Sequence, residues 1–291
     1  MSTAIMRTAR DYASLIKLSH SVFALPFALL SLLVAARGDL SARLLLLCVA
    51  AVFSARTSAM AYNRWLDRAI DAENPRTKGR EIPRGAVKAG NALLLAIGSG
   101  GAFLWCCALL SPTCGYLGVP VLAFLLGYSH TKRYTALCHL WLGVALGIAP
   151  VAAWVAGQGN LVLLGTPMLL GLGVACWVAG FDITYACQDE RFDRAHGLHS
   201  IPVLLGVRRA MWVSRLLHAS SLLLFVMFGR AASLGTAYTF GVVAAGLLLG
   251  WQHWQLRRGD SPGNQAAFFT ANGILSIAML AAGCADLYLF A

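Results

Sequence analysis

The sequence contains few charged residues and very few acidic ones. Charged residues make up 12% of its 291 residues, with 23 Lys and Arg against 12 Asp and Glu, whereas a soluble globular domain carries about 25% charged residues. The hydrophobic share is 58% and the mean hydropathy is +0.68. This composition argues against a water-soluble fold. It also argues against nucleic-acid binding, because so apolar a chain has no broad basic face to present.

The sequence also lacks any Cys-x-x-Cys pair. Its eight cysteines lie almost entirely inside apolar runs, at positions 48, 106, 107, 114, 138, 176, 187 and 284. Neither a zinc site nor a disulfide framework is indicated. We interpret these cysteines as small buried hydrophobic residues.

Long apolar runs dominate what is present. A bilayer-spanning helix needs about 20 mostly apolar residues, and nine such runs are bounded by charge, Gly, Pro or Asn. The expected spans are 16–36, 42–62, 91–111, 114–131, 137–157, 161–183, 211–229, 233–255 and 266–290. No stretch remains for a soluble domain, so the prediction is one all-α, polytopic membrane domain over residues 1–291. The first run is interpreted as a span rather than a signal peptide, because it has span length and no convincing cleavage site.

The basic residues predict the orientation of this domain. Most precede the first span or lie in loops after the even-numbered spans, and the opposite side holds only Arg37, Arg43 and Arg230. Because Lys and Arg are enriched in cytoplasmic loops, we expect a cytoplasmic N-terminus and an external C-terminus in the cytoplasmic (inner) membrane.

The acidic residues gather in two places on that same side. Eight of the twelve follow spans 2 and 6: Asp67, Asp71, Glu73, Glu81, Asp182, Asp189, Glu190 and Asp193. The rule for basic loops does not explain this clustering, which suggests chemistry at the membrane surface.

Each cluster contains oxygen-bearing side chains spaced four residues apart. Asn63, Asp67 and Asp71 form one series, and Tyr185, Asp189 and Asp193 form the other. On a continuous helix each series would line one face, with about 6 Å between successive side chains along the axis. A simpler interpretation is that each series is a solvated helix end. Two such series favour a cation site instead, because like charges at this spacing repel and carboxylates at a membrane are costly. Mg²⁺ takes one or two carboxylates together with water and phosphate.

Basic residues beside the first cluster indicate which ligand the bound metal ions would share with the protein. A loop punctuated by Pro and Gly carries Arg76, Lys78, Arg80 and Arg84, and Arg56 lies inside span 2 on the same helical face as Asn63. Cations beside metal-binding carboxylates are the parts of a phosphate or diphosphate site. The alternative for the loop is an ordinary cytoplasmic loop that only sets topology.

With these motifs, the sequence resembles the UbiA-type intramembrane aromatic prenyltransferases over essentially its whole length. The resemblance rests on nine spans, on both spaced motifs after spans 2 and 6, and on three further segments. These are Asn74-Pro75-Arg76-Thr77, Tyr128 with Lys132-Arg133-Tyr134-Thr135, and Gly197-Leu198-His199-Ser200-Ile201-Pro202. It implies nine helices around a central cavity.

The resemblance also implies site residues. Asp67, Asp71, Asp189 and Asp193 would be catalytic metal ligands for Mg²⁺, two ions with the diphosphate. Asn63 would contact diphosphate or Mg²⁺, and Tyr185 would orient an aspartate or the aromatic ring. Arg56, Arg76, Lys78, Arg80, Lys132, Arg133 and His199 would bind substrate, with Arg133 holding the carboxylate of the acceptor. His199 is a departure, because some hydroxybenzoate-type members have Lys before that Ser.

The implied reaction moves a polyprenyl group from polyprenyl diphosphate to an aromatic acid in respiratory quinone synthesis. The preferred acceptor is 4-hydroxybenzoate, prenylated at C3. The alternative acceptor is a dihydroxynaphthoate of menaquinone synthesis, because residues 137–140 and 182–189 look similar to those of family members grouped with such acceptors. Partners are the two substrates and the bilayer, with no nucleic acid and no obligate protein partner. The Gly-rich segments 143–157 and 170–180 are candidates for the groove that takes the prenyl chain.

Two other classes of membrane protein fit the sequence less well. A transporter would use Arg56 and Asp182 as buried coupling residues, but the chain shows no convincing inverted repeat. A lipid-alcohol phosphotransferase would show a single dense acidic cluster, whereas this chain divides its acids between two.

Overall fold

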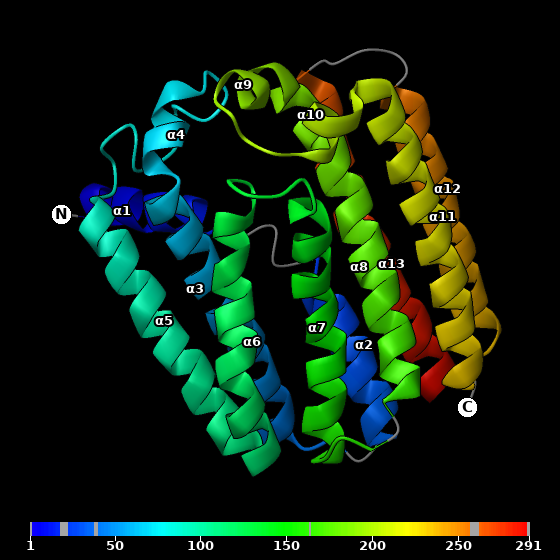
Figure 1. The fold of residues 1–291 in the computed structure, drawn as a ribbon. Coiled ribbons are helices and arrows are strands. Elements are labelled where there is room, and N and C mark those ends of the chain that lie inside the picture. The colour runs from blue at the N-terminus through cyan, green and yellow to red at the C-terminus, as the bar shows by residue number, and fades with distance from the viewer. Residues whose placement is uncertain (1, 18–22, 38–39, 163, 257–261, 290–291) are drawn as a thin grey trace.

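The computed structural model describes residues 2–17, 23–37, 40–162, 164–256 and 262–289, and these contain helices and no strand. The long helices run roughly side by side, and the short ones cover one end of the bundle (Figure 1). The long helices are α2 (Leu25–Ala36), α3 (Ala42–Leu66), α5 (Ala89–Leu110), α6 (Pro112–Thr131), α7 (Cys138–Gln158), α8 (Gly165–Ala186), α11 (Val207–Ala231), α12 (Thr236–Leu256) and α13 (Pro262–Tyr288). The short ones are α1 (Ser2–Leu15), α4 (Arg68–Glu73), the 3-10 turn η2 (Cys187–Asp189), α9 (Glu190–Ala195) and α10 (Ile201–Leu205).

Seven helices in the described part of the chain are long and apolar enough to cross a membrane. They are α3, α5, α6, α7, α8 with its extension to Ala195, α11 and the Phe268–Tyr288 part of α13. Helix α2 is apolar but has 12 residues, and α12 is not among the seven. The all-helical membrane fold is confirmed, whereas nine crossings remain a prediction.

The amino-terminal region differs from the expected first span. Helix α2 begins at Leu25 and carries Pro26 in its first turn, where the missing N–H of proline has no helical partner to lose. Residues 18–22 of the expected span lie outside the described residues. Before them lies α1, a separate helix that the sequence did not predict; its Leu15 is fully buried and clusters with Ala61 of α3 and Val87. Helix α1 is thereby fixed against the rest of the fold.

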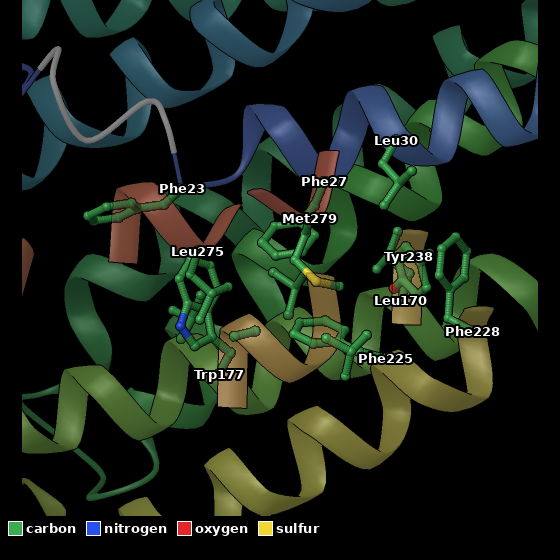
Figure 2. Packing of buried hydrophobic residues seen from close by; sticks show 14 of the residues in the cluster. Phe23, Phe27, Leu30, Leu170, Trp177, Phe225, Phe228, Tyr238, Leu275 and Met279 are labelled. Carbon is green, nitrogen blue, oxygen red and sulfur yellow. The ribbon is translucent and has the colours of Figure 1, made fainter. Parts of the chain in front are cut away.

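Aromatic packing holds one half of the bundle together. The ring of Phe27 on α2 lies 5.4 Å from Trp177 on α8 and 5.4 Å from Phe225 on α11, measured between centroids. Leu275 and Met279 of α13 are fully buried in the same cluster (Figure 2). This cluster ties four helices together on the side of the bundle away from α5.

Helices α7 and α8 pack with almost no space between their backbones. A Cβ added to Gly143 would lie 2.3 Å from the carbonyl oxygen of Ala175, and one added to Gly147 would lie 2.3 Å from that of Gly171. Only glycine permits this approach. These glycines therefore fix the register of two helices, which corrects the expectation that residues 170–180 open a groove.

Both acidic motifs lie where a long helix breaks, and neither lies on one continuous helix. Helix α3 ends at Leu66, and Asp67 (φ −88°, ψ 4°) separates it from α4. Helix α8 ends at Ala186, and Asp189 (φ −96°, ψ 2°) separates η2 from α9. In the first motif the four-residue spacing nevertheless continues across the break, because the Asp67 N–H donates to the Asn63 carbonyl at 2.9 Å and the Asp71 N–H donates to the Asp67 carbonyl at 2.8 Å. The breaks leave α4 and α9 at the same end of the bundle (Figure 1).

Candidate functional site

The four motif aspartates come together at this end, and each is paired with a different basic residue. The pairs are Asp67 with Arg133 at 2.7 Å, Asp71 with Arg80 at 2.6 Å, Asp193 with Lys132 at 2.8 Å, and Asp189 with Arg76. All four of these cations were candidate substrate-binding residues from the sequence.

Arg76 connects the two motifs directly. It follows α4 in the chain, yet its Nε donates to Asp189 Oδ1 at 2.8 Å and its Nη2 donates to Asp189 Oδ2. Asn74 adds a donation from Nδ2 to the same Oδ1 at 3.3 Å, while its own Oδ1 accepts the backbone N–H of Arg76 at 2.9 Å. Asn74 is buried. This role of Asn74 was not predicted from the sequence, although Asn74 stands within the Asn-Pro-Arg-Thr segment.

Asp71, on α4, is bound by residues of the loop that follows this helix. Arg80 Nη1 donates to both carboxylate oxygens, at 2.6 and 2.7 Å. The backbone carbonyl of Asp71 accepts the Thr77 hydroxyl at 3.1 Å. The loop of residues 74–80 is thus folded around this carboxylate.

Asp67 is oriented by two partners. Asn63, one helical turn earlier, donates from Nδ2 to Oδ2 at 2.8 Å, and Arg133 donates to Oδ1 at 2.7 Å. Burial raises the pKa of Asp67 above its ordinary value, against the lowering effect of these two donors. Arg133 also donates to the carbonyl of Ser129 at 2.8 Å, which fixes its guanidinium at the end of α6.

Asp193 is the most enclosed of the four. Its side chain is 0% exposed, and the Lys132 ammonium lies 2.8 Å from Oδ1, but neither carboxylate oxygen receives a hydrogen bond of acceptable direction. Buried carboxylate oxygens are costly without partners. This carboxylate is therefore under-coordinated as it stands.

The other site residues predicted from the sequence are not paired with the four aspartates. Tyr185 has a buried hydroxyl without a hydrogen-bond partner, and its ring packs against Phe268 at 5.2 Å. Arg56 donates from Nη2 to the Lys17 carbonyl at 3.4 Å, and its Nε is unpartnered. Lys78 and His199 are exposed. The backbone N–H of His199 donates to the Lys132 carbonyl at 2.8 Å. The side chains of Lys78 and His199 make no contact with the four ion pairs.

Two further charged residues, Arg64 and Glu81, lie close to the site and were not predicted from the sequence. Arg64 is 5% exposed and lies within electrostatic range of Asp67, Asp71 and Glu81. Glu81 is also buried and accepts the Ser14 hydroxyl at 2.5 Å. The sequence marks Arg64 only as one basic residue among several, so nothing in it distinguishes a buried arginine from an exposed one.

An apolar cavity of about 290 Å³ opens beside the charged cluster. Helices α3, α5, α6 and α7 line it, and its polar groups are few, with Arg56, Asn63 and Tyr128 among them. The lining continues to Leu110 and Leu164, which lie at the far ends of α5 and of the loop before α8. The cavity therefore runs along the helices, with the acidic motifs near one end.

The charged cluster fits Mg²⁺ only as a shared ligand set. Within the described residues, no three carboxylate, imidazole or thiol groups converge closely enough to hold a metal ion alone. Mg²⁺, however, usually takes one or two protein carboxylates and completes its shell with water and phosphate oxygens. The two unsatisfied oxygens of buried Asp193 are suited to such an ion.

Apolar helices of spanning length, with a charged site at the end of an apolar cavity, define an integral membrane protein. The UbiA prenyltransferase family matches residues 24–274, and the chain belongs to this family.

Individual relatives agree with this assignment. The chain is 34% identical over 286 residues to a 4-hydroxybenzoate octaprenyltransferase of Vibrio cholerae serotype O1, covering 95% of this chain and 94% of the relative. A UbiA homolog from Aeropyrum pernix K1 superposes with a TM-score of 0.83 at 34% identity, covering 91% and 96% of the two chains. A UbiA homolog from Archaeoglobus fulgidus bound to DMAPP and Mg²⁺ has the same fold, with a TM-score of 0.68 at 19% identity and coverage of 95% and 99%.

Proposed function

We propose that this protein transfers a polyprenyl group from polyprenyl diphosphate to C3 of 4-hydroxybenzoate, with Mg²⁺, in respiratory quinone synthesis at the cytoplasmic membrane. One observation carries the proposal: two aspartate motifs, each beside its own cations, meet near the end of a long apolar cavity. The Vibrio cholerae relative named as a 4-hydroxybenzoate octaprenyltransferase supports the reaction.

When the diphosphate end of the donor binds, the aspartates and the basic residues that are now paired would each take a new partner. Asp67, Asp71, Asp189 and Asp193 would hold Mg²⁺, for which we propose two ions, and their present basic partners would turn to the phosphate oxygens. Mg²⁺, when bound, neutralises the charge of the diphosphate and so makes it a better leaving group. Arg76 and Arg80 suit this exchange, because a guanidinium fork matches either a carboxylate or a phosphate.

The acceptor would bind between the charged cluster and the cavity. Arg133 is proposed to hold the acceptor carboxylate, and Lys132 lies beside it in sequence with its ammonium on Asp193. The ring carbon next to the hydroxyl attacks the allylic carbon of the donor as the diphosphate leaves. Asn63 would keep Asp67 in place during this step, through the 2.8 Å hydrogen bond already present.

The prenyl chain would lie in the apolar cavity. The lining is formed mainly by Ala, Val, Leu and Cys side chains, and burial of an apolar chain there is favourable by about 0.8 kcal/mol per methylene group. Arg56, which also lines the cavity, would face the diphosphate end. Tyr185 is proposed to orient the ring or an aspartate, and exposed Lys78 and His199 are proposed to contact diphosphate only once it is bound.

The test is a product assay on the purified protein in detergent. Polyprenyl diphosphates of several lengths are combined with 4-hydroxybenzoate or with a dihydroxynaphthoate, with Mg²⁺ and with EDTA. The proposal predicts a prenylated 4-hydroxybenzoate that requires Mg²⁺. If product forms only with the dihydroxynaphthoate, the enzyme would be assigned to menaquinone synthesis instead. No product with any acceptor, from folded protein, would refute the transferase reaction and favour transport.

A further inference from the structure

A buried histidine and carboxylate form a pair that the proposed donor and acceptor sites do not use. His139 Nδ1 lies 2.7 Å from Asp182 Oδ2. The His139 side chain is 3% exposed and that of Asp182 is 24% exposed. A carboxylate accepts hydrogen bonds, so Nδ1 of His139 is the donor. The histidine is therefore enclosed, while the aspartate keeps one edge open.

The glycine contacts between α7 and α8 place this pair. Gly143 meets Ala175 and Ala179, and Gly147 meets Gly171 and Ala175. Antiparallel helices in this register bring His139, one turn before Gly143, level with the residues that follow Ala179. The backbone packing thus fixes His139 beside Asp182 independently of their attraction.

Asp182 lies near residues that line the cavity. Tyr128 lines the cavity and lies within electrostatic range of both Asp182 and Asp67. On α7, Leu142 is one turn from His139 and also lines the cavity. Asp182 therefore lies between the end of the cavity and the acidic motifs.

The contacts of Asp182 distinguish it from the other acids of the site. Asp67, Asp71, Asp189 and Asp193 are each paired with Arg or Lys. Among the described residues, Asp182 receives its one hydrogen bond from a histidine. Its partner is thus an imidazole rather than a guanidinium or an ammonium group.

We propose that Asp182 is the base that removes the ring proton of the aromatic acceptor, with His139 as its positioning residue. This inference rests on the proposed function. The donor C–O bond breaks with its electron pair on the departing diphosphate, and the ring carbon beside the hydroxyl forms a bond to the allylic carbon. That ring carbon then gives its proton to Asp182, and the C–H electron pair restores aromaticity. Asp182 later releases the proton to water.

His139 acts through Asp182. Its Nδ1 occupies Oδ2, so Oδ1 is the proposed atom that accepts the proton. A glutamine at this position keeps an N–H donor of similar reach, whereas a leucine does not. The two substitutions therefore separate the hydrogen bond from the packing volume.

The test follows product formation and diphosphate release separately, using 4-hydroxybenzoate with deuterium at both ring positions beside the hydroxyl. For Asp182→Asn we expect product formation to fall at least ~100-fold, the scale of a lost general base, while donor KM stays within about twofold. The residual reaction should be slowed by deuterium more than in the wild type, because proton removal has become rate-limiting. His139→Leu should lower kcat, and His139→Gln should restore most of it.

Asp11→Asn is the matched control, because Asp11 is paired with Arg84 outside the cavity, and it should keep wild-type rates. If Asp182→Asn does not fold, Asp182→Glu provides the same isotope readout with the carboxylate displaced by one methylene. Wild-type product rates in Asp182→Asn, or an unchanged isotope effect in Asp182→Glu, would overturn the inference. Loss of donor binding in Asp182→Asn would also overturn it and assign the pair to the diphosphate site. Failure of the wild type to prenylate any acceptor would instead remove the proposed function itself.

Discussion

Asp67 and Asp189 occupy equivalent positions in two different helix breaks. Their backbone angles are φ −88°, ψ 4° and φ −96°, ψ 2°, and neither side chain caps the helix that follows. Each carboxylate is therefore available to a cation from elsewhere in the chain, Arg133 for Asp67 and Arg76 for Asp189. Asp189 is thereby joined to the segment that follows the first motif, and Asp67 to the end of α6.

The two break aspartates should be equally indispensable. Asp67→Asn and Asp189→Asn should each lower kcat/KM at least ~100-fold, because each removes a carboxylate proposed to hold the Mg²⁺ that neutralises the departing diphosphate. Glu190→Gln is the matched control, since Glu190 is adjacent to Asp189 but pairs with exposed Arg194. Substantial activity in either aspartate variant would contradict the two-motif metal site.

Arg76 should require its guanidinium and not only its charge. It contacts both oxygens of Asp189 through two nitrogens, a fork that lysine cannot reproduce. Arg76→Lys should raise the donor KM by about tenfold, and Arg76→Gln should raise it further. The acceptor KM should change little. Equal donor KM values for Arg76→Lys and the wild type would show that only the charge matters.

Arg133 should act on the acceptor. If it binds the acceptor carboxylate, Arg133→Ala raises the acceptor KM by at least tenfold, about 1.4 kcal/mol of binding, and raises the donor KM less. Steady-state kinetics with each substrate varied in turn provides the measurement. An effect confined to the donor would reassign Arg133 to the diphosphate, consistent with its contact to Asp67.

Filling the cavity should shorten the accepted donor. Ala149 lines the cavity about 15 Å along α7 from His139, at 1.5 Å per residue. Ala149→Phe should reduce turnover of long donors at least ~10-fold more than turnover of a two-isoprene donor, because the ring blocks the distal cavity. Val144→Phe, on the exposed side of α7, controls for bulk in the same helix. An equal loss for all donor lengths would place the prenyl chain elsewhere.

The stability of the fold should depend on pH through the carboxylate of Glu81. Burial alone would raise its pKa, but the Ser14 hydroxyl, its own backbone N–H and the charges of Arg64 and Lys17 together hold the pKa below its ordinary value of 4.5. A lowered pKa stabilises the fold above pH 4.5, and this contribution is lost as the pH falls through the folded-state pKa. Glu81→Gln should therefore lower the thermal midpoint at pH 7, by an amount corresponding to about 1–3 kcal/mol. The gap should narrow below pH 4.5, and a gap independent of pH would exclude this linkage.

Much of the fold and site could be predicted from the sequence because the signals are local. Apolar run length predicts helices such as α5 and α7 to within two residues, and spacing identifies the four aspartates that the structure gathers. Spacing could not reveal the breaks at Asp67 and Asp189, since no Gly or Pro marks them. Nor could it reveal the burial of Arg64 or the meeting of His139 with Asp182, 43 residues apart in the chain, because both depend on how helices pack.

The central claim is that both motifs hold one Mg²⁺-diphosphate group, and donor binding tests it most directly. Calorimetry would measure the affinity of a non-cleavable polyprenyl thiodiphosphate for the wild type, Asp67→Asn, Asp189→Asn and Glu190→Gln, with Mg²⁺ and with EDTA. The account predicts tight binding only with Mg²⁺, unchanged in Glu190→Gln and at least tenfold weaker in each aspartate variant. Binding that persists in EDTA, or that depends on one motif alone, would contradict it.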